Sequence, residues 1–201
     1  MSTAVQSPPV VSVHSRPRSK QWTAAEFHRV SDTGVFEGQN LILIEGEVLH
    51  MPPPNPPHDM ALILLDTVLR ACFPTGHVFR TQMSLVLGQT TDPVPDYAVV
   101  AGSARDFVQK PTTAVLVAEV AESSLAYDTG DKASLYASAG IADYWVVDLV
   151  NRQLVVMRDP VADTSRAFGF AYATVSNIPD GQSVSPRAAP AATVAVADLL
   201  P

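Results

Sequence analysis

The chain has 201 residues, of which 47% are hydrophobic and 16% are charged, and its formal net charge is −7. This length and composition predict one globular domain with a sizeable core, and the acidic charge argues against broad electrostatic attraction to nucleic acid, which depends on Lys and Arg. No apolar run is long enough to span a bilayer and no secretory signal is visible, so we expect a cytoplasmic protein without a membrane segment.

The N-terminal segment, residues 1–20, is rich in Ser, Pro and Val and has no hydrophobic periodicity. We therefore expect a flexible leader there, followed by a single domain over 21–201. Three basic residues near the end of the leader leave a second interpretation open, an arm that contacts DNA. Thr23-Ala24-Ala25-Glu26 is a capping box and predicts a short helix to about Val30.

The next segment predicts short strands around one long helix. Two runs, 41–44 and 48–51, predict a hairpin that turns at Glu45-Gly46. Apolar residues recur at helical spacing over 58–73, which predicts a helix with one buried face. Two further strands are expected next, at 77–82 and 84–87.

The second half of the chain carries near-continuous apolar runs at 97–100 and 115–120. Such runs are typical of buried strands in a sheet whose two faces are covered by helices. A helix is expected at 131–139, closed by Gly140. Further strands are expected at 144–148, 154–158, 168–175 and 193–197, the last two at sheet edges. The predicted fold class is α/β, with a mixed central sheet flanked by helices.

Two acidic residues accompany these apolar runs. Asp96 precedes the first run, Glu119 lies inside the second, and Lys132 follows in the next helix. A carboxylate buried without a partner loses much of its solvation free energy, so such a pair requires a cation. Carboxylate oxygens suit Mg²⁺ or Mn²⁺, and a nearby ammonium can stabilise charge on a phosphate. These residues therefore predict metal-dependent cleavage of phosphodiester bonds.

An ordered set of short motifs surrounds the three residues. It comprises 43–48 (LIEGEV), 51–54 (MPPP) with His58, Gln82, Pro95-Asp96, Glu119-Val120, Asp128, Lys132 with Tyr136, and 143–148 (DYWVVD). In this order the motifs resemble the Uma-type restriction-endonuclease family, a branch of the PD-(D/E)xK nuclease superfamily. The resemblance runs from about Trp22 to Arg158. It implies a restriction-endonuclease-like fold and cleavage of nucleic acid.

The resemblance also implies how the site is built. Asp96, Glu119 and the peptide carbonyl of Val120 are the implied ligands of Mg²⁺ or Mn²⁺. The superfamily usually places a lysine two residues after the second acid, where this chain has Ala121. The resemblance therefore implies that the lysine has migrated to Lys132, on the following helix.

Four further residues are candidates for supporting roles. Gln82 either holds a water or phosphate or makes a simple edge-strand hydrogen bond. His58 either points into the cleft or caps its helix. Asp128 either pairs with Lys132, four residues later, or only starts the helix. Glu45 is either a carboxylate of the site or a solvated turn residue.

The expected function is a metal-dependent endonuclease that acts on DNA. Because one small domain carries one site, we expect a homodimer for cutting both strands of a duplex. Relatives usually carry a glutamate at the position of Ile42, and its absence supports an alternative: a catalytically weak or inactive member that binds nucleic acid or protein. A different metal-carboxylate hydrolase on the same residues is a third interpretation.

Overall fold

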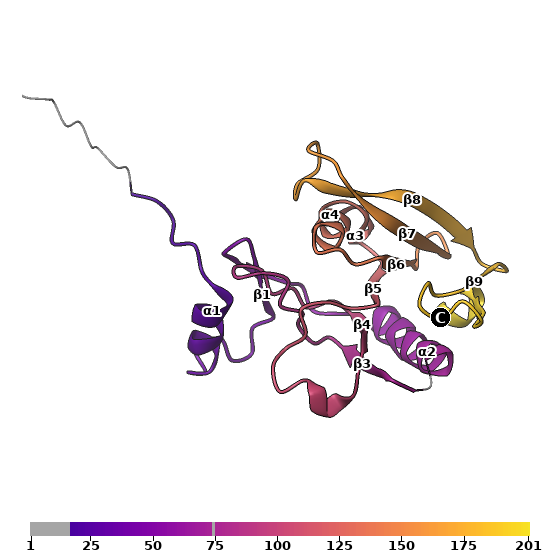
Figure 1. The fold of residues 1–201 in the computed structure, drawn as a ribbon, viewed down its shortest axis with the longest axis horizontal. Coiled ribbons are helices and arrows are strands. Elements are labelled where there is room, and N and C mark those ends of the chain that lie inside the picture. The colour runs from indigo at the N-terminus through magenta and orange to yellow at the C-terminus, as the bar shows by residue number, and fades with distance from the viewer. Residues whose placement is uncertain (1–16, 74) are drawn as a thin grey trace, which may run out of the picture.

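The structure is a computed structural model that describes residues 17–73 and 75–201 (Figure 1). Most of the expected leader, residues 1–16, lies outside the described residues. No helix within these ranges is long and apolar enough to cross a bilayer. In chain order the elements are α1 (Ala24–Ser31), β1 (Leu41–Ile44), β2 (Glu47–His50), α2 (Pro56–Cys72), β3 (His77–Thr81), β4 (Tyr97–Ala101), η1 (Ala104–Asp106), β5 (Leu116–Ala121), α3 (Leu125–Thr129), α4 (Asp131–Ser138), β6 (Asp143–Asp148), β7 (Gln153–Ala162), β8 (Phe170–Pro179), β9 (Ser183–Val184), β10 (Val194–Ala195) and η2 (Val196–Leu199).

Helix α1 and the β1–β2 hairpin lie together at one end of the molecule, beside the main sheet (Figure 1). The predicted capping box is present: the Thr23 side chain accepts from the Glu26 N–H, and the Glu26 carboxylate accepts from the Thr23 N–H. A small apolar core joins the helix to the hairpin, formed by Ala24, Phe27 and Leu43. The predicted helix and hairpin are both confirmed.

The main sheet has six strands in the order β3-β4-β5-β6-β7-β8. Only β5 and β6 run parallel, and every other neighbouring pair is antiparallel. A parallel pair needs a crossover connection, and the segment that contains α3 and α4 supplies it. The predicted mixed sheet flanked by helices is confirmed.

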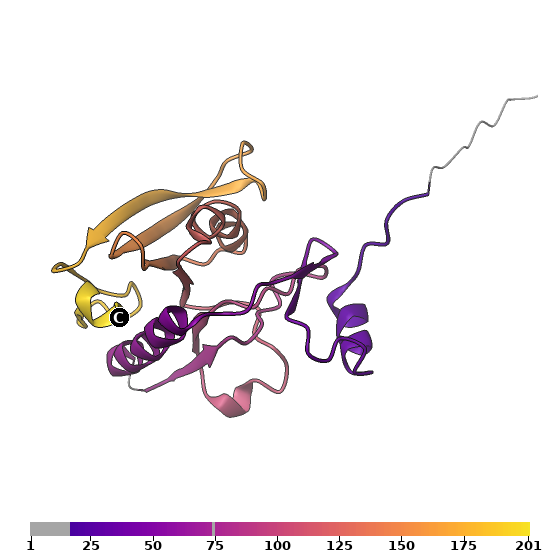
Figure 2. The ribbon, with the colours of Figure 1, turned by 180° about the vertical axis from the view of Figure 1, so that it is seen from behind.

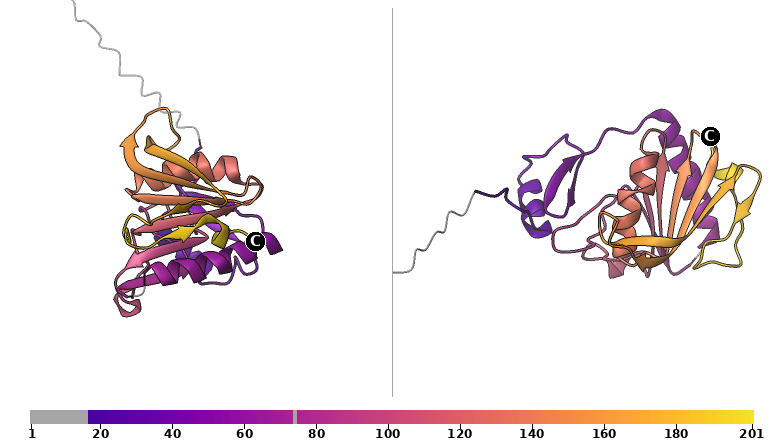
Figure 3. Two further views of the ribbon diagram at one scale, coloured as in Figure 1. Left: turned by 90° about the vertical axis from the view of Figure 1, so that its right-hand side faces the viewer. Right: turned by 90° about the horizontal axis from the view of Figure 1, so that it is seen from above.

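Side chains of the central strands alternate between two cores. Alternate residues of β5, from Leu116 to Val120, pack beneath α2, whereas Val117 and Ala121 pack beneath α4. Figure 3 shows α2 and the α3–α4 pair on opposite sides of the sheet. Because Glu119 lies two residues after Val117 in β5, the two side chains are on the same face of the strand, and Glu119 points toward α4.

Three predicted elements differ from the structure. The segment 84–87 is a loop and not a strand, because Leu85 and Val86 bond through their N–H groups to carbonyls of other loops, those of Pro93 and Pro111. The predicted helix at 131–139 is preceded by a separate short helix, α3, which the sequence pattern did not indicate. The segment 193–197 does not join the main sheet, since β10 pairs with β9 in a two-stranded sheet of its own.

Candidate active site

Asp96 and Glu119 are brought together by the antiparallel pairing of β4 with β5. Tyr97 lies opposite Ala118 in this pair, so the residue before β4 meets the residue after Ala118. The backbone N–H of Asp96 donates a hydrogen bond to Glu119 Oε2 at 3.2 Å. The two acids singled out in the sequence are therefore neighbours where this strand pair ends.

Two hydrogen bonds hold the Asp96 carboxylate. Its Oδ2 accepts from the Val120 N–H at 2.9 Å, and His58 Nε2 lies 3.0 Å from the same oxygen. Burial alone would raise the pKa of Asp96, but the contacts with His58 and Val120 outweigh it and hold the pKa below its usual value. An ionised carboxylate only accepts hydrogen bonds, so His58 Nε2 carries a proton. The same contact raises the pKa of His58.

Glu119 is almost fully buried, and Lys132 is its cationic partner. Lys132 Nζ lies 3.1 Å from Glu119 Oε2, and the Tyr136 hydroxyl donates to Oε1 at 2.8 Å. Burial raises the pKa of Glu119 to about 8, because desolvation outweighs the attraction of the ammonium. Burial would lower the pKa of Lys132, but Glu119 and Asp128 outweigh it and raise that pKa. Lys132 therefore stays charged, and Glu119 is the partner whose charge changes near neutral pH.

Asp128 is the second carboxylate around this ammonium. Its Oδ1 lies 3.1 Å from Lys132 Nζ, and its Oδ2 accepts from the Ser124 hydroxyl at 2.5 Å. Asp128 lies within α3, whereas α4 begins only after Gly130. The break between the helices requires glycine, because a Cβ at position 130 would lie 2.6 Å from the Ala126 carbonyl oxygen. Of the two roles considered for Asp128, the structure has the pairing with Lys132.

A hollow of about 490 Å³ opens in front of these residues, and we call it the site hollow. Its lining includes six residues predicted from the sequence, His58, Gln82, Asp96, Val120, Asp128 and Lys132, with Glu119 buried behind them. The Gln82 N–H donates to the Asp96 carbonyl at 2.9 Å, which fixes the approach to β4. Glu45 is not brought to the site hollow: it is exposed in the turn between β1 and β2, where its side chain is solvated.

Sequence reasoning missed three polar residues of this region. Asn55 is the N-cap of α2, its amide contacts the Glu122 carboxylate, and both residues line the site hollow. Tyr136, which entered the sequence analysis only as part of the motif with Lys132, is buried, and its hydroxyl donates to Glu119, one of the two acids. The sequence did contain signals for two of them. An Asn directly before a helix that begins with Pro indicates the N-cap Asn55, and the spacing of four residues between Lys132 and Tyr136 places both on one helix face.

The donor set determines which ions this site suits. Within 17–73 and 75–201, no three His, Cys, Asp or Glu side chains are arranged as a metal cluster. Asp96 and Glu119 offer two carboxylates, and the hydrogen bonds of the Asp96 side chain involve Oδ2, which leaves Oδ1 without a hydrogen bond among the described residues. Mg²⁺ is usually held through one or two carboxylates, with waters and substrate phosphates completing its shell. The residues present therefore fit Mg²⁺ or Mn²⁺ better than a closed zinc site.

Comparisons with known proteins place this geometry in a family. The crystal structure of "a putative nuclease belonging to DUF820" from Anabaena variabilis ATCC 29413 superposes with a TM-score of 0.64 at 16% identity, covering 89% of this chain and 97% of that one, which shows a shared fold. No curated protein matches the chain. The family model Uma2, described as "Putative restriction endonuclease", matches residues 24–197. Because that match spans most of the chain, the protein belongs to the Uma2 family, as its motifs predicted.

Proposed function

We propose that this protein is a divalent-metal-dependent endonuclease that hydrolyses phosphodiester bonds in DNA. The observation that carries the proposal is the meeting of Asp96, Glu119 and Lys132 beside one hollow, two acids and an ammonium from three different elements. Family membership supports a nuclease in general. The metal, the roles of the residues and the DNA substrate are the parts that the experiments below test.

Asp96 and Glu119 would hold Mg²⁺ or Mn²⁺, with the Val120 carbonyl as a third ligand. In a strand, the N–H and C=O of one residue point to the same neighbouring strand. The Val120 N–H donates to Asp96 Oδ2, so the Val120 carbonyl also faces the Asp96 side. When bound, the ion would act as a Lewis acid on the phosphate and lower the pKa of a coordinated water. Because Glu119 must be ionised to bind, affinity should rise with pH through about 8.

Lys132 acts through its charge and not as a base. Its pKa is raised despite burial, because the Glu119 and Asp128 carboxylates surround it, so it keeps its proton at neutral pH. Its side chain is 10% exposed and lines the site hollow. A fixed ammonium at this position stabilises the negative charge that develops on a phosphate in the transition state.

His58 is a positioning residue. Its Nε2–H holds Asp96 Oδ2, whereas its Nδ1 is buried and has no hydrogen-bond partner among the described residues. An imidazole with one nitrogen bonded to Asp96 and the other buried offers no free nitrogen to a substrate in the site hollow. Its contribution is to fix the rotamer of Asp96 and leave the second carboxylate oxygen for the ion.

The direct test is a cleavage assay on supercoiled plasmid, linear duplex, single-stranded DNA and RNA, with Mg²⁺, Mn²⁺ or EDTA. Asp96→Asn and Glu119→Gln each remove one anionic ligand while keeping the side-chain size. Both variants should lose cleavage and bind Mn²⁺ more weakly in calorimetry, whereas Glu47→Gln, exposed in β2, should behave as wild type. Cleavage that persists in EDTA, or unchanged Mn²⁺ affinity in both acid variants, would refute the proposal.

A second candidate is a nucleic-acid-binding module without robust catalysis. Ile42 lines the site hollow and is 3% exposed, at the position where relatives are expected to carry a glutamate. Lys132 already contacts both Glu119 and Asp128, so part of the negative charge is neutralised without an ion. DNA binding measured beside cleavage separates the two functions. Binding without cleavage in either metal would favour the module.

A further inference from the structure

The outer edge of β8 has no partner strand. β8 is the last strand of the main sheet and pairs with β7 alone, so within the described residues its other edge is unpaired. Figures 1 and 2, seen from opposite sides, both show β8 as the outermost strand. Every residue from Ala173 to Asn177 is exposed. Such an edge presents a row of backbone N–H and C=O groups to which another strand can pair.

β8 lacks the features that usually protect an edge strand. Its ten residues, Phe170–Pro179, include no Lys, Arg, Asp or Glu, and its single proline is the last residue. At the opposite edge of the sheet, β3 has only five residues and contains His77 and Arg80. Natural edges are commonly protected by short length, charge or bulges. By this comparison β3 is protected and β8 is open to pairing.

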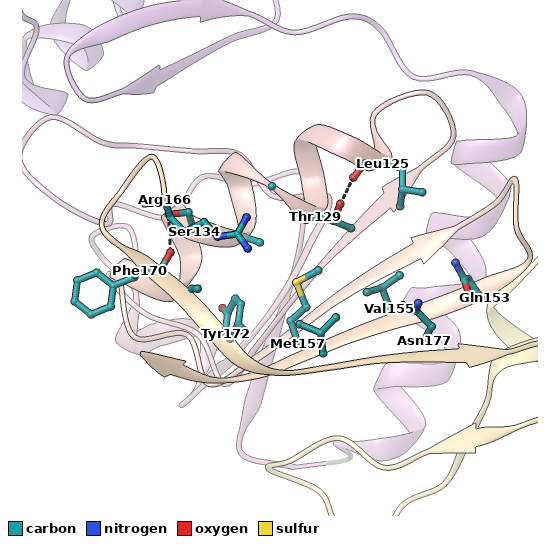
Figure 4. A pocket seen from close by; sticks show the side chains of 14 residues that line it. Leu125, Thr129, Ser134, Gln153, Val155, Met157, Arg166, Phe170, Tyr172 and Asn177 are labelled. Atoms are coloured by element: carbon teal, nitrogen blue, oxygen red, sulfur yellow. Dashed lines mark hydrogen bonds between the residues drawn. The ribbon is translucent and has the colours of Figure 1, made fainter. Parts of the chain in front are cut away.

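Apolar surface lies beside this open edge. Figure 4 shows a second hollow, of about 380 Å³, between the α3–α4 pair and strands β7 and β8, with Val155 and Met157 on its sheet side and Leu125 on its helix side. Phe170 and Val175 also line it and are 37% and 56% exposed. A strand laid along β8 would cover these side chains together with the backbone edge.

We propose that β8 is a homodimer interface, in which residues 173–177 pair antiparallel with the same residues of a second copy and Val175 lies at the two-fold axis. Pairing about a two-fold axis sets the strand against itself, so a charged residue near the axis would face a like charge. The absence of any charge along β8 removes that repulsion and favours a second copy over a charged partner.

The size of the contact sets the expected affinity. Five paired residues and the adjoining apolar side chains form a small contact, whereas specific complexes usually bury roughly 1,200–2,000 Å². We therefore expect a dissociation constant in the micromolar range. The interface does not depend on metal chemistry. Only its use, setting two sites against the two strands of a duplex, rests on the proposed function.

Sedimentation velocity without metal or nucleic acid tests the assembly separately from catalysis. The wild type should dimerise at micromolar concentration, and Val175→Lys, which sets two ammoniums close together, should raise the dissociation constant at least about tenfold. The matched control is Val150→Lys, at a valine 65% exposed in the β6–β7 turn, which should dimerise as wild type. A monomeric wild type at about 100 µM, or a dimer unaffected by Val175→Lys, would overturn the proposal.

Cysteine cross-linking tests the register independently. In an antiparallel pair, directly opposite side chains share a face, so a two-fold axis perpendicular to the sheet sets one residue opposite its own copy. In a Cys72→Ser background, single cysteines at Thr174, Val175, Ser176 and Asn177 should give one clear maximum of disulfide-linked dimer. Thr81→Cys, on the opposite sheet edge, is the control. Equal cross-linking at all five positions would exclude the β8 pairing.

Discussion

The buried Glu119 should make the stability of this protein fall as the pH rises. Burial raises its folded-state pKa to about 8, from 4.5 for an exposed glutamate. A group with a raised folded pKa contributes stability that is fully present below its unfolded pKa and is lost as the pH rises through the folded one. His58 acts in the same direction above pH 6.5, because its hydrogen bond to Asp96 raises its pKa.

The size of the effect follows from the shift. Moving a pKa from 4.5 to about 8 corresponds to roughly 4–5 kcal/mol, at about 1.4 kcal/mol per unit. The attraction of Lys132 is already included in this shift, and the window between about pH 5 and pH 9 covers most of it, so we expect a loss of about 3–4 kcal/mol in the free energy of unfolding. For a domain of this size, about 1 kcal/mol changes Tm by about 2–4 °C, so Tm should fall by roughly 5–15 °C. Added Mn²⁺ should restore most of this loss at the alkaline end, because it binds the ionised carboxylate.

Thermal melts of wild type, Glu119→Gln and Glu47→Gln across this pH range are the assay. The amide of Glu119→Gln does not titrate, and the Tyr136 hydroxyl can change from donor to acceptor to satisfy it. As the pH rises, the Tm of wild type and the Tm of Glu47→Gln should fall by the same amount, whereas the Tm of Glu119→Gln should change much less. If the curves of wild type and Glu119→Gln ran parallel, Glu119 would not be the titrating group.

Variants at three further positions test the remaining site residues. Lys132→Ala should abolish cleavage yet leave Mn²⁺ affinity equal or higher in calorimetry. It should lower the free energy of unfolding by about 3–5 kcal/mol, because two buried carboxylates lose their cation. Full nuclease activity in this variant would remove Lys132 from the mechanism. His58→Gln, which keeps an N–H donor, should retain more Mn²⁺ affinity than His58→Ala, and equal losses would mean that this hydrogen bond does not position Asp96. Ile42→Glu adds a carboxylate to the wall of the site hollow and should tighten Mn²⁺ binding about tenfold, so unchanged affinity would show that position 42 does not reach the ion.

The sheet was predictable where its strands are buried on both faces. The runs at 97–100 and 115–120 are almost wholly apolar, and β4 and β5 form there. The segment 84–87 was mistaken for a strand because its N–H groups bond to carbonyls of loop residues, among them that of Pro111, which no local pattern reveals. Helix α3 was missed because its five residues are too few to show a helical period.

Local patterns alone, without the family motifs, indicated the site only where a residue contradicts its surroundings. Glu119 stands out as an acid within an apolar run, and the structure gives it a cation and a hydroxyl partner. The contact of His58 with Asp96 could not be derived locally, because it depends on the start of α2 meeting the start of β4. Glu45 was left between two interpretations, a carboxylate of the site and a solvated turn residue, and the hairpin turn exposes it.

The proposed migration of the lysine has a physical reason in the core beside Glu119. Ala121, the usual lysine position, shares the α4 side of β5 with Glu119 and has no exposed surface. That side is filled by aromatic rings, with the centroids of Tyr136 and Tyr144 only 5.0 Å apart, so a lysine at position 121 would overpack it. Lys132 lies about one helical turn before Tyr136, and both side chains reach Glu119, one as a cation and one as a hydroxyl donor. Helix α4, which fills this core, therefore also brings the ammonium to Glu119, and the proposed chemistry requires only that an ammonium reach this carboxylate, from whichever element carries it.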